Sequence, residues 1–165
     1  HGSGVVVSNN GYIVTNHHVT EGAKIIDVQF ANGMTLPADL ITSSKAHDLS
    51  LIKVRASGLT AIPIVSNPDD TREGDEVFVI GAPGDKELGQ SVSKGIISAK
   101  RNIDGVKVIQ TDTKISPGNS GSPLINKKGE IIGVINMKMI GEGFEGLSFA
   151  IDSRYLHSVL GLEYE

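Results

Sequence analysis

The sequence predicts an all-β fold, a sandwich or a barrel, followed by one short C-terminal helix. Short runs of β-branched residues recur along the 165 residues, and turns rich in Gly, Asn and Asp separate them. The 20 glycines and the absence of tryptophan fit a chain of short strands and tight turns. The length suffices for one domain, or for two small halves that share one fold.

The first half of the chain begins with a predicted β-hairpin. Asn9-Asn10-Gly11 lies between its two strands and favours a tight turn, because Asn and Gly tolerate positive φ angles. Asn32-Gly33 marks a second turn of this kind. The predicted strands cover residues 5–7, 12–15, 25–30, 34–41 and 49–54.

The second half repeats this pattern and ends in the only helix that the sequence predicts. Its strands are expected at residues 76–80, 91–100, 106–111, 123–126, 130–139 and 147–151. Asp152 or Ser153 caps the helix and Gly161 ends it. One face of the helix is apolar and consists of Tyr155, Leu156, Val159 and Leu160.

A polar stretch at residues 66–74 is the best internal boundary. It predicts an N-terminal β half at residues 1–68, and a C-terminal β half with the terminal helix at residues 69–165. A site built from both halves would lie in the cleft between them, where ligand sites are common.

Composition excludes several classes of function. Fifteen basic and 19 acidic residues give a net charge of −4, so we expect no nucleic-acid partner. The chain has no cysteine, which rules out disulfides, thiolate metal ligands and thiol catalysis. No apolar run approaches the roughly 18 residues of a membrane helix, so we expect no integral membrane span.

The most informative segment is Ser116-Pro117-Gly118-Asn119-Ser120-Gly121. It presents a serine in a tight, glycine-flanked turn between two predicted strands. Glycines leave backbone N–H groups uncovered, and such groups beside a nucleophilic oxygen can stabilise a developing oxyanion. A serine hydroxyl also needs a base, and the base needs an acid to orient it.

His18 and Asp48 are the best candidates for these two roles. His18 follows a predicted strand, and Asp48 directly precedes another. The chain order His, Asp, Ser is one of three known orders for this catalytic triad. Asp112 is the alternative acid, but we interpret it as a support for the loop beneath Ser120.

These residues lie within motifs that span nearly the whole chain and resemble the protease domain of the HtrA (Deg) family. This family is a bacterial branch of the trypsin-like peptidases. The matching segments are Gly2-Ser3-Gly4-Val5, Gly11-Tyr12-Ile13-Val14-Thr15-Asn16, His18-Val19, Asp48-Leu49, Gly81-Ala82-Pro83, Gly95-Ile96-Ile97-Ser98, Gln110-Thr111-Asp112, Pro117-Gly118-Asn119-Ser120-Gly121, Gly129-Glu130 and Phe149-Ala150-Ile151. Ser122 stands where the family usually has Gly, and His17 where it commonly has Asn.

The resemblance implies a two-barrel, chymotrypsin-like fold and a serine endopeptidase that acts on unfolded or damaged polypeptides. It implies the triad His18, Asp48 and Ser120, with an oxyanion hole at Gly118-Asn119-Ser120 that uses the N–H groups of Gly118 and Ser120. It also implies a periplasmic or other extracytoplasmic location and is compatible with a homo-oligomer. No cofactor or metal is implied.

By the same resemblance, two segments form the primary specificity pocket. One wall consists of Lys114, Ile115 and Ser116, and the other of Ile135, Asn136, Met137 and Lys138. The isoleucines favour a small or medium aliphatic side chain, with the Lys114 ammonium reaching water. The strand at 135–139 is expected to pair with an extended substrate backbone.

Asn119, not Asp, precedes the nucleophile, so a salt bridge from the N-terminus cannot hold the oxyanion hole. Because the peptide at Gly118 can rotate at little cost, we expect that the oxyanion hole can be unformed at rest. Substrate or a neighbouring loop would then complete it.

Other readings of the sequence are open or excluded. A chaperone or scaffold could bind extended peptides in the same cleft with a latent protease site, and an esterase could use the same triad. The glycines at 141–146 match the sequence pattern of a dinucleotide-binding loop. We exclude dinucleotide binding there because a predicted strand follows the pattern instead of a helix. His17 and His18 are adjacent, but the sequence shows no third ligand that would complete a metal site with them.

Overall fold

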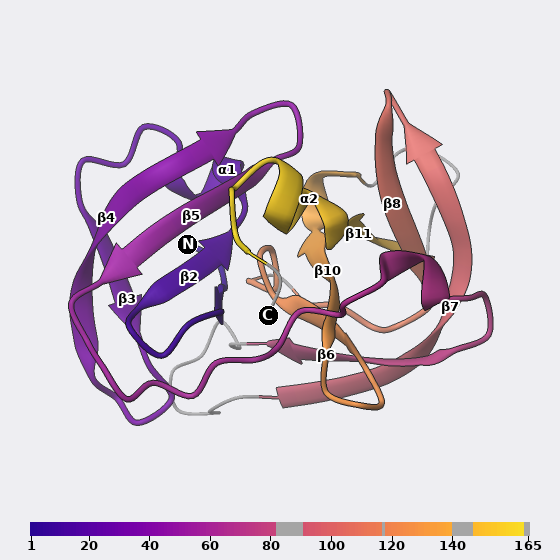
Figure 1. Cartoon of the computed structure of the whole chain (residues 1–165), viewed down its shortest axis with the longest axis horizontal. Coiled ribbons are helices and arrows are strands. Elements are labelled where there is room, and N and C mark those ends of the chain that lie inside the picture. The colour runs from indigo at the N-terminus through magenta and orange to yellow at the C-terminus, as the bar shows by residue number, and fades with distance from the viewer. Residues whose placement is uncertain (82–90, 117, 140–146, 164–165) are drawn as a thin grey trace.

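A computed structural model of the 165-residue chain describes residues 1–81, 91–116, 118–139 and 147–163. Ala82, Pro83, Pro117 and the glycine pattern at 141–146 lie outside the described residues. Two β-sheets lie side by side, and the C-terminal helix sits at their junction (Figure 1). The prediction of a two-barrel, nearly all-β fold is confirmed.

The first sheet contains five antiparallel strands among the described residues, in the order β1-β2-β5-β4-β3. The predicted hairpin is present: Val5 pairs with Val14, and Gly11 in the turn has a φ of +109°. Buried apolar side chains, among them Ile13, Ile52 and Val54, pack on one side. The strands are β1 (Val5–Val6), β2 (Tyr12–Thr15), β3 (Ile26–Gln29), β4 (Thr35–Ser44) and β5 (Leu49–Val54).

The second sheet closes into a barrel of six strands within the described part of the chain, in the order β10-β11-β8-β7-β6-β9. Closure leaves no free sheet edge in this half. Its interior is filled by aliphatic side chains from several strands, such as Val77, Ile97 and Ile132. The strands are β6 (Glu76–Gly81), β7 (Ser91–Ile103), β8 (Val106–Thr111), β9 (Pro123–Asn126), β10 (Ile131–Asn136) and β11 (Ser148–Asp152).

A third apolar cluster joins the two sheets. Val14 and Leu51 of the first sheet pack in one buried cluster with Phe149 of the barrel and Leu156 of the terminal helix. Burial of such side chains stabilises the relative position of the halves, at roughly 1.5–3 kcal/mol for each large aliphatic or aromatic group. The division at residue 68 remains a prediction, and a short 3₁₀ turn, η1 (Pro68–Asp70), lies there.

The terminal helix, α2 (Arg154–Ser158), is where the sequence predicts it. Asp152 caps it, since Oδ1 accepts a hydrogen bond from the Arg154 N–H at 2.9 Å, and Gly161 follows it with a φ of +77°. The prediction that this is the only helix is wrong. One further turn, α1 (His17–Thr20), follows β2 and is too short to produce a helical repeat in the sequence.

The predicted strand at 130–139 is also too long. Strand β10 ends at Asn136, and Met137–Met139 form the 3₁₀ turn η3. The Asn136 side chain explains the difference, because its Oδ1 accepts a hydrogen bond from the Lys138 N–H at 2.8 Å. Such a local bond is typical of Asn in turns and ends the extended conformation.

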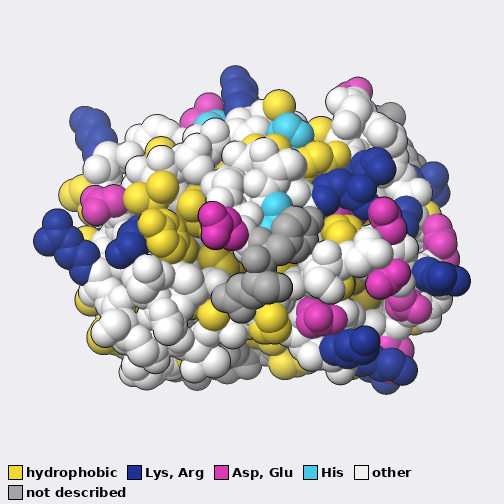
Figure 2. Space-filling view, in the orientation of Figure 1, with side chains coloured by type: hydrophobic (Ala, Val, Ile, Leu, Met, Phe, Trp, Pro, Cys, Tyr) yellow, Lys and Arg dark blue, Asp and Glu magenta, His cyan; other side chains and the backbone are white. Residues whose placement is uncertain are grey.

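Acidic and basic side chains are intermixed over the barrel half of the molecule (Figure 2). One ion pair links the boundary segment to the terminal helix, with Arg154 Nη2 at 2.9 Å from Asp69 Oδ1. The hydrogen bond and the charge of Arg154 lower the pKa of Asp69 below its ordinary value of 3.8. Within the described residues, no helix is long and apolar enough to span a membrane.

This ion pair predicts an acid-dependent term in stability. Since folding lowers the pKa of Asp69, the pair stabilises the fold fully above pH 3.8 and loses this effect as the pH falls through the lowered value. Asp69→Asn is expected to lower stability slightly at neutral pH, and to reduce the further loss on acidification. Urea unfolding across this range measures both effects.

The matched control is Asp70→Asn, because the Asp70 carboxylate accepts only a 3.3 Å hydrogen bond from Asn67. Its acid dependence should equal that of the wild type. An unchanged acid dependence in Asp69→Asn would contradict the prediction. The effect is small because the Asp69 side chain is 75% exposed and salt screens it.

Candidate active site

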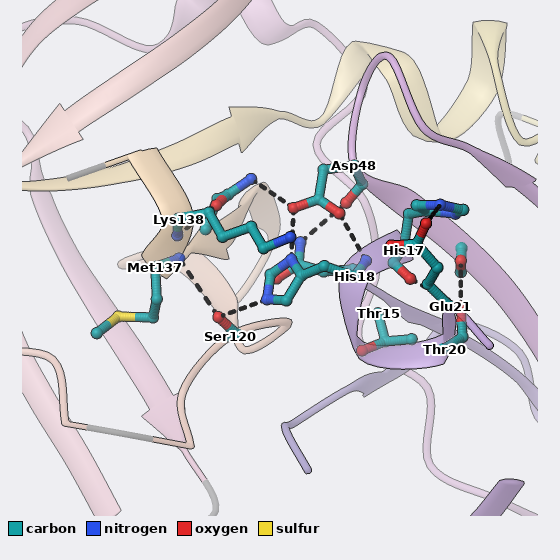
Figure 3. Close-up of polar contacts among 12 residues, drawn as sticks. Thr15, His17, His18, Thr20, Glu21, Asp48, Ser120, Met137 and Lys138 are labelled. Carbon is teal, nitrogen blue, oxygen red and sulfur yellow. Dashed lines mark hydrogen bonds and ion pairs between the residues drawn. The ribbon is translucent and has the colours of Figure 1, made fainter. Parts of the chain in front are cut away.

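Three side chains from both halves meet in one hydrogen-bonded line between the sheets (Figure 3). His18 Nε2 lies 3.2 Å from Ser120 Oγ, and His18 Nδ1 lies 2.6 Å from Asp48 Oδ2. The three residues are thus neighbours in space although 102 residues separate His18 from Ser120.

His18 is presented by the one-turn helix α1. Asn16 precedes this helix in an extended conformation, and its buried side chain donates from Nδ2 to the Asp48 carbonyl at 3.0 Å. Thr20 closes the turn, with Oγ1 at 3.1 Å from the His17 carbonyl. The side chain of His17 points away from Ser120 and toward Glu21, with Nε2 3.8 Å from Oε1 (Figure 3).

Asp48 lies at the turn before β5 with a φ of +51°, in the left-handed region that few non-glycine residues adopt. Its carboxylate has three partners. Oδ1 accepts from the His18 backbone N–H at 2.8 Å, and Oδ2 contacts His18 Nδ1 and accepts from Asn136 Nδ2 at 2.9 Å. Strained backbone of this kind persists where the surroundings over-determine it.

This arrangement selects one tautomer of the imidazole. A carboxylate accepts only, so Nδ1 carries the proton and donates to Asp48. Nε2 is then an acceptor that faces the Ser120 hydroxyl. The histidine is therefore oriented to take a proton from the serine, and Asp48 can stabilise the imidazolium that results.

The loop around Ser120 is a tight turn with two uncommitted backbone donors. Asn119 N–H donates to the Ser116 carbonyl at 3.1 Å, and Gly118 between them has a φ of +96°. Glycine adopts a positive φ at little cost, which explains the residue type at this position. Neither the Gly118 nor the Ser120 N–H donates to an acceptor among the described residues. Whether these two groups form an oxyanion hole remains a prediction.

The two predicted walls of the specificity pocket lie on either side of this loop in the sequence. Lys114 and Ser116 are exposed, and Ile115 is half-buried against the barrel core. On the other wall, Ile135 is buried in that core, Met137 packs against it, and Lys138 is exposed.

The strand that was expected to pair with substrate ends at Asn136, and residues 137–139 form the turn η3. Pairing of this segment with a substrate backbone stays a prediction. Asn136 is buried, and its side chain is committed to Asp48 and Lys138. The Met137 N–H donates to Ser120 Oγ at 3.3 Å. The assignment of both walls to substrate binding stays a prediction.

Three features of the site were missed or misinterpreted in the sequence. In the sequence, Asn16 was only the last residue of a family motif and Asn136 part of a predicted pocket wall, yet both side chains donate hydrogen bonds to Asp48. Only the tertiary structure brings these amides to the aspartate. Asp112 was interpreted as a support for the loop beneath Ser120, but within the described residues its side chain makes no hydrogen bond to that loop. It is exposed, and its Oδ1 accepts from the Ile96 N–H at 2.9 Å.

A cavity of about 280 Å³ borders His18, Asp48 and Asn136. Charged side chains of both signs surround it, including Glu21, Lys45, Asp104 and Lys138. In the described ranges, no group of three or more His, Asp or Glu side chains is arranged to hold a metal ion.

A two-sheet fold that aligns serine, histidine and aspartate in this way is that of a two-barrel serine peptidase. The comparisons agree, since the trypsin-like peptidase domain family matches residues 2–134. The chain belongs to this family, and its relatives are serine proteases of the HtrA and Deg type.

Two relatives and one solved structure illustrate the similarity. The serine endoprotease DegS of Haemophilus influenzae is 44% identical over 168 residues, which cover 96% of this chain and 48% of that protein. A probable periplasmic serine endoprotease, DegP-like, of Ectopseudomonas mendocina is 42% identical, covering 91% of this chain and 32% of that protein. The HtrA-type protease AlgW with decapeptide superposes with a TM-score of 0.86 at 37% identity, covering 96% of this chain and 50% of that one. The chain thus spans half or less of each of these three proteins.

Proposed function

We propose that the chain is a serine endopeptidase in which Ser120 is the nucleophile, His18 the general base and Asp48 the orienting acid. The observation that carries this proposal is the hydrogen-bonded line from Asp48 through His18 to Ser120, with 2.6 Å and 3.2 Å between its heavy atoms. Among the described residues, Ser120 is the one serine whose hydroxyl lies within hydrogen-bonding distance of a ring nitrogen of His18. Its loop also carries two backbone N–H groups that have no acceptor among these residues.

In the first step, the Ser120 oxygen attacks the peptide carbonyl while His18 Nε2 takes its proton. The carbon–nitrogen bond then breaks, and the leaving amine receives that proton from the imidazolium. In the second step, His18 activates a water molecule, which attacks the acyl-enzyme and releases the carboxylic acid and the free Ser120 hydroxyl.

The negative charge on the attacked oxygen needs donors within reach in the transition state. We assign this role to the N–H groups of Gly118 and Ser120, on the basis that both are uncommitted within the described residues. The Asn119 side chain faces Gly81, and only its backbone belongs to the loop at the proposed hole.

The proposed substrates are extended, unfolded or damaged polypeptides, and the proposed location is extracytoplasmic. Support for the first comes from the solved structure of the HtrA-type protease AlgW with decapeptide, and for the second from the relative named as a probable periplasmic serine endoprotease. Ile115 and Met137 beside the loop favour an aliphatic side chain before the cleaved bond. A homo-oligomer is compatible with this proposal.

The test is covalent labelling with a fluorophosphonate, together with turnover of unfolded casein. We expect one label per chain, attached to Ser120, and cleavage of casein. Ser120→Ala should lose both, with an unchanged unfolding midpoint.

Other outcomes identify other functions. Peptide binding without label or turnover would support a chaperone or scaffold and overturn the proposal. Turnover of small acyl esters without cleavage of casein would support an esterase. Ser120→Ala also tests for a contaminating protease, because a contaminant would still cleave casein in a preparation of this variant.

A further inference from the structure

The segment Gly2-Ser3-Gly4 lies against the loop that carries Ser120, and Ser3 makes two hydrogen bonds to it. The Ser3 N–H donates to the Ser120 carbonyl at 2.8 Å, and Ser3 Oγ donates to the Gly118 carbonyl at 2.6 Å. The Ser3 carbonyl in turn accepts from Thr15 Oγ1 at 2.6 Å. A residue near the start of the chain is therefore fastened both to β2 and to the nucleophile loop.

The surrounding glycines make this approach possible. A Cβ at Gly2 would lie 2.7 Å from a methyl carbon of Val19 and 3.0 Å from the Ser120 carbonyl oxygen. At Gly121, where φ is +94°, a Cβ would overlap the Ser3 carbonyl oxygen. Side chains at either position would separate the segment from the loop, so this close contact depends on glycine.

Backbone groups from Gly118 to Gly121 can be accounted for one by one. The Gly118 carbonyl accepts from Ser3 Oγ, and the Asn119 N–H donates to Ser116. Further along, the Asn119 carbonyl accepts from the Ser122 N–H at 2.9 Å, and the Gly121 N–H donates to Ile135 at 3.0 Å. The Ser120 carbonyl accepts from the Ser3 N–H.

Two of these bonds therefore come from Ser3, and the N–H groups in this stretch without an acceptor among the described residues are those of Gly118 and Ser120. The Gly118 and Ser120 N–H groups belong to the two peptides that flank the planar Gly118–Asn119 peptide, whose carbonyl accepts from Ser3 Oγ. Restraining this central peptide therefore limits the rotation of both donors.

We propose that Ser3 is a positioning residue, whose hydroxyl holds the Gly118 carbonyl and so keeps the Gly118 and Ser120 N–H groups aimed at the developing oxyanion. This inference rests on the proposed function. Without the hydroxyl, the peptide between Gly118 and Asn119 loses its restraint on the carbonyl side, and glycine opposes rotation only weakly.

The expected consequence is confined to the transition state. Oxyanion donors act mainly on the charge that develops during attack, so their misalignment lowers kcat more than it raises KM. One hydrogen bond of this kind corresponds to roughly a tenfold decrease in kcat for Ser3→Ala. The rate of fluorophosphonate labelling of Ser120 should fall by a similar factor.

Three variants test the proposal in the full chain, each measured for kcat, KM, labelling rate and unfolding midpoint. Ser3→Ala should show the tenfold loss in kcat with KM within about twofold of wild type. Ser3→Thr, which keeps the hydroxyl, should restore most of kcat. Ser8→Ala is the matched control: it removes a hydroxyl that makes two hydrogen bonds at the β1–β2 turn, where the Ser3 hydroxyl makes one, and it should leave kcat unchanged.

A wild-type kcat in Ser3→Ala would overturn the inference, as would a loss that appears only in KM or that Ser3→Thr does not restore. If Ser3→Ala does not fold, Ser3→Cys keeps the side-chain size with a weaker donor, and its kcat decides in the same way. A wild-type chain that neither reacts with fluorophosphonate nor cleaves casein would overturn the proposed function together with this inference. An active wild type with an unaffected Ser3→Ala overturns the inference alone.

Discussion

Replacing His18 by alanine is expected to lower kcat on a peptide substrate by about six orders of magnitude, as loss of the base does in comparable triads. Within the part of the chain that the structure describes, the imidazole is the one side chain that hydrogen-bonds to both Ser120 Oγ and the Asp48 carboxylate. Without it, the serine hydroxyl keeps its proton and is a poor nucleophile. Single-turnover kinetics with an activated ester extend the range over which so large a loss can be measured.

The matched control is His17→Ala, in the same one-turn helix. His17 faces Glu21, and its ring does not contact Ser120 (Figure 3). We expect kcat to stay within about twofold of wild type, because loss of a surface His–Glu contact is a small effect. Equal losses in both variants would mean that the helix, and not the imidazole of His18, accounts for the effect.

Asp48→Asn is expected to lower kcat by about four orders of magnitude while leaving the fold intact. The carboxylate accepts from His18 Nδ1, from the His18 N–H and from Asn136 Nδ2. An amide can offer only one oxygen, so its NH₂ group must face one of these donors. If it faces Nδ1, the imidazole moves its proton to Nε2 and can no longer accept the proton of Ser120.

Asp112→Asn is the control for this substitution, because Asp112 is the other acid that the sequence offers. Its carboxylate is exposed and bonds the Ile96 N–H, to which an amide oxygen can bond equally. Its kcat should match that of the wild type, and the unfolding midpoints of both variants should be similar. A larger loss in Asp112→Asn than in Asp48→Asn would show that the acid has been assigned to the wrong residue.

Most elements of the fold follow from local patterns. Strands β2, β5, β8 and β9 have the bounds that their β-branched runs predict. The errors lie at the ends of several strands and at one short helix. Asn136 ends β10 by accepting from the Lys138 N–H, and α1 consists of one turn without a side-chain cap. Neither produces a repeat that a sequence pattern can reveal.

The residue types of the site and their chain order can be predicted from the sequence without coordinates. A serine in a glycine-rich turn, a histidine after one strand and an aspartate before another suffice to predict nucleophile, base and acid, because this chemistry demands these groups. The strand pattern also determined the all-β class, since alternating burial is a local property.

The groups that hold these residues in place become visible in the three-dimensional fold. Asn16 and Asn136 reach Asp48 from different halves of the molecule, and Ser3 reaches the Gly118 carbonyl across 115 residues. Hydrogen bonds of this kind depend on distances of about 3 Å between atoms that chain order does not relate. Packing of the two sheets around a shared apolar cluster sets those distances, which is why the supporting residues emerge from the fold and not from the motifs.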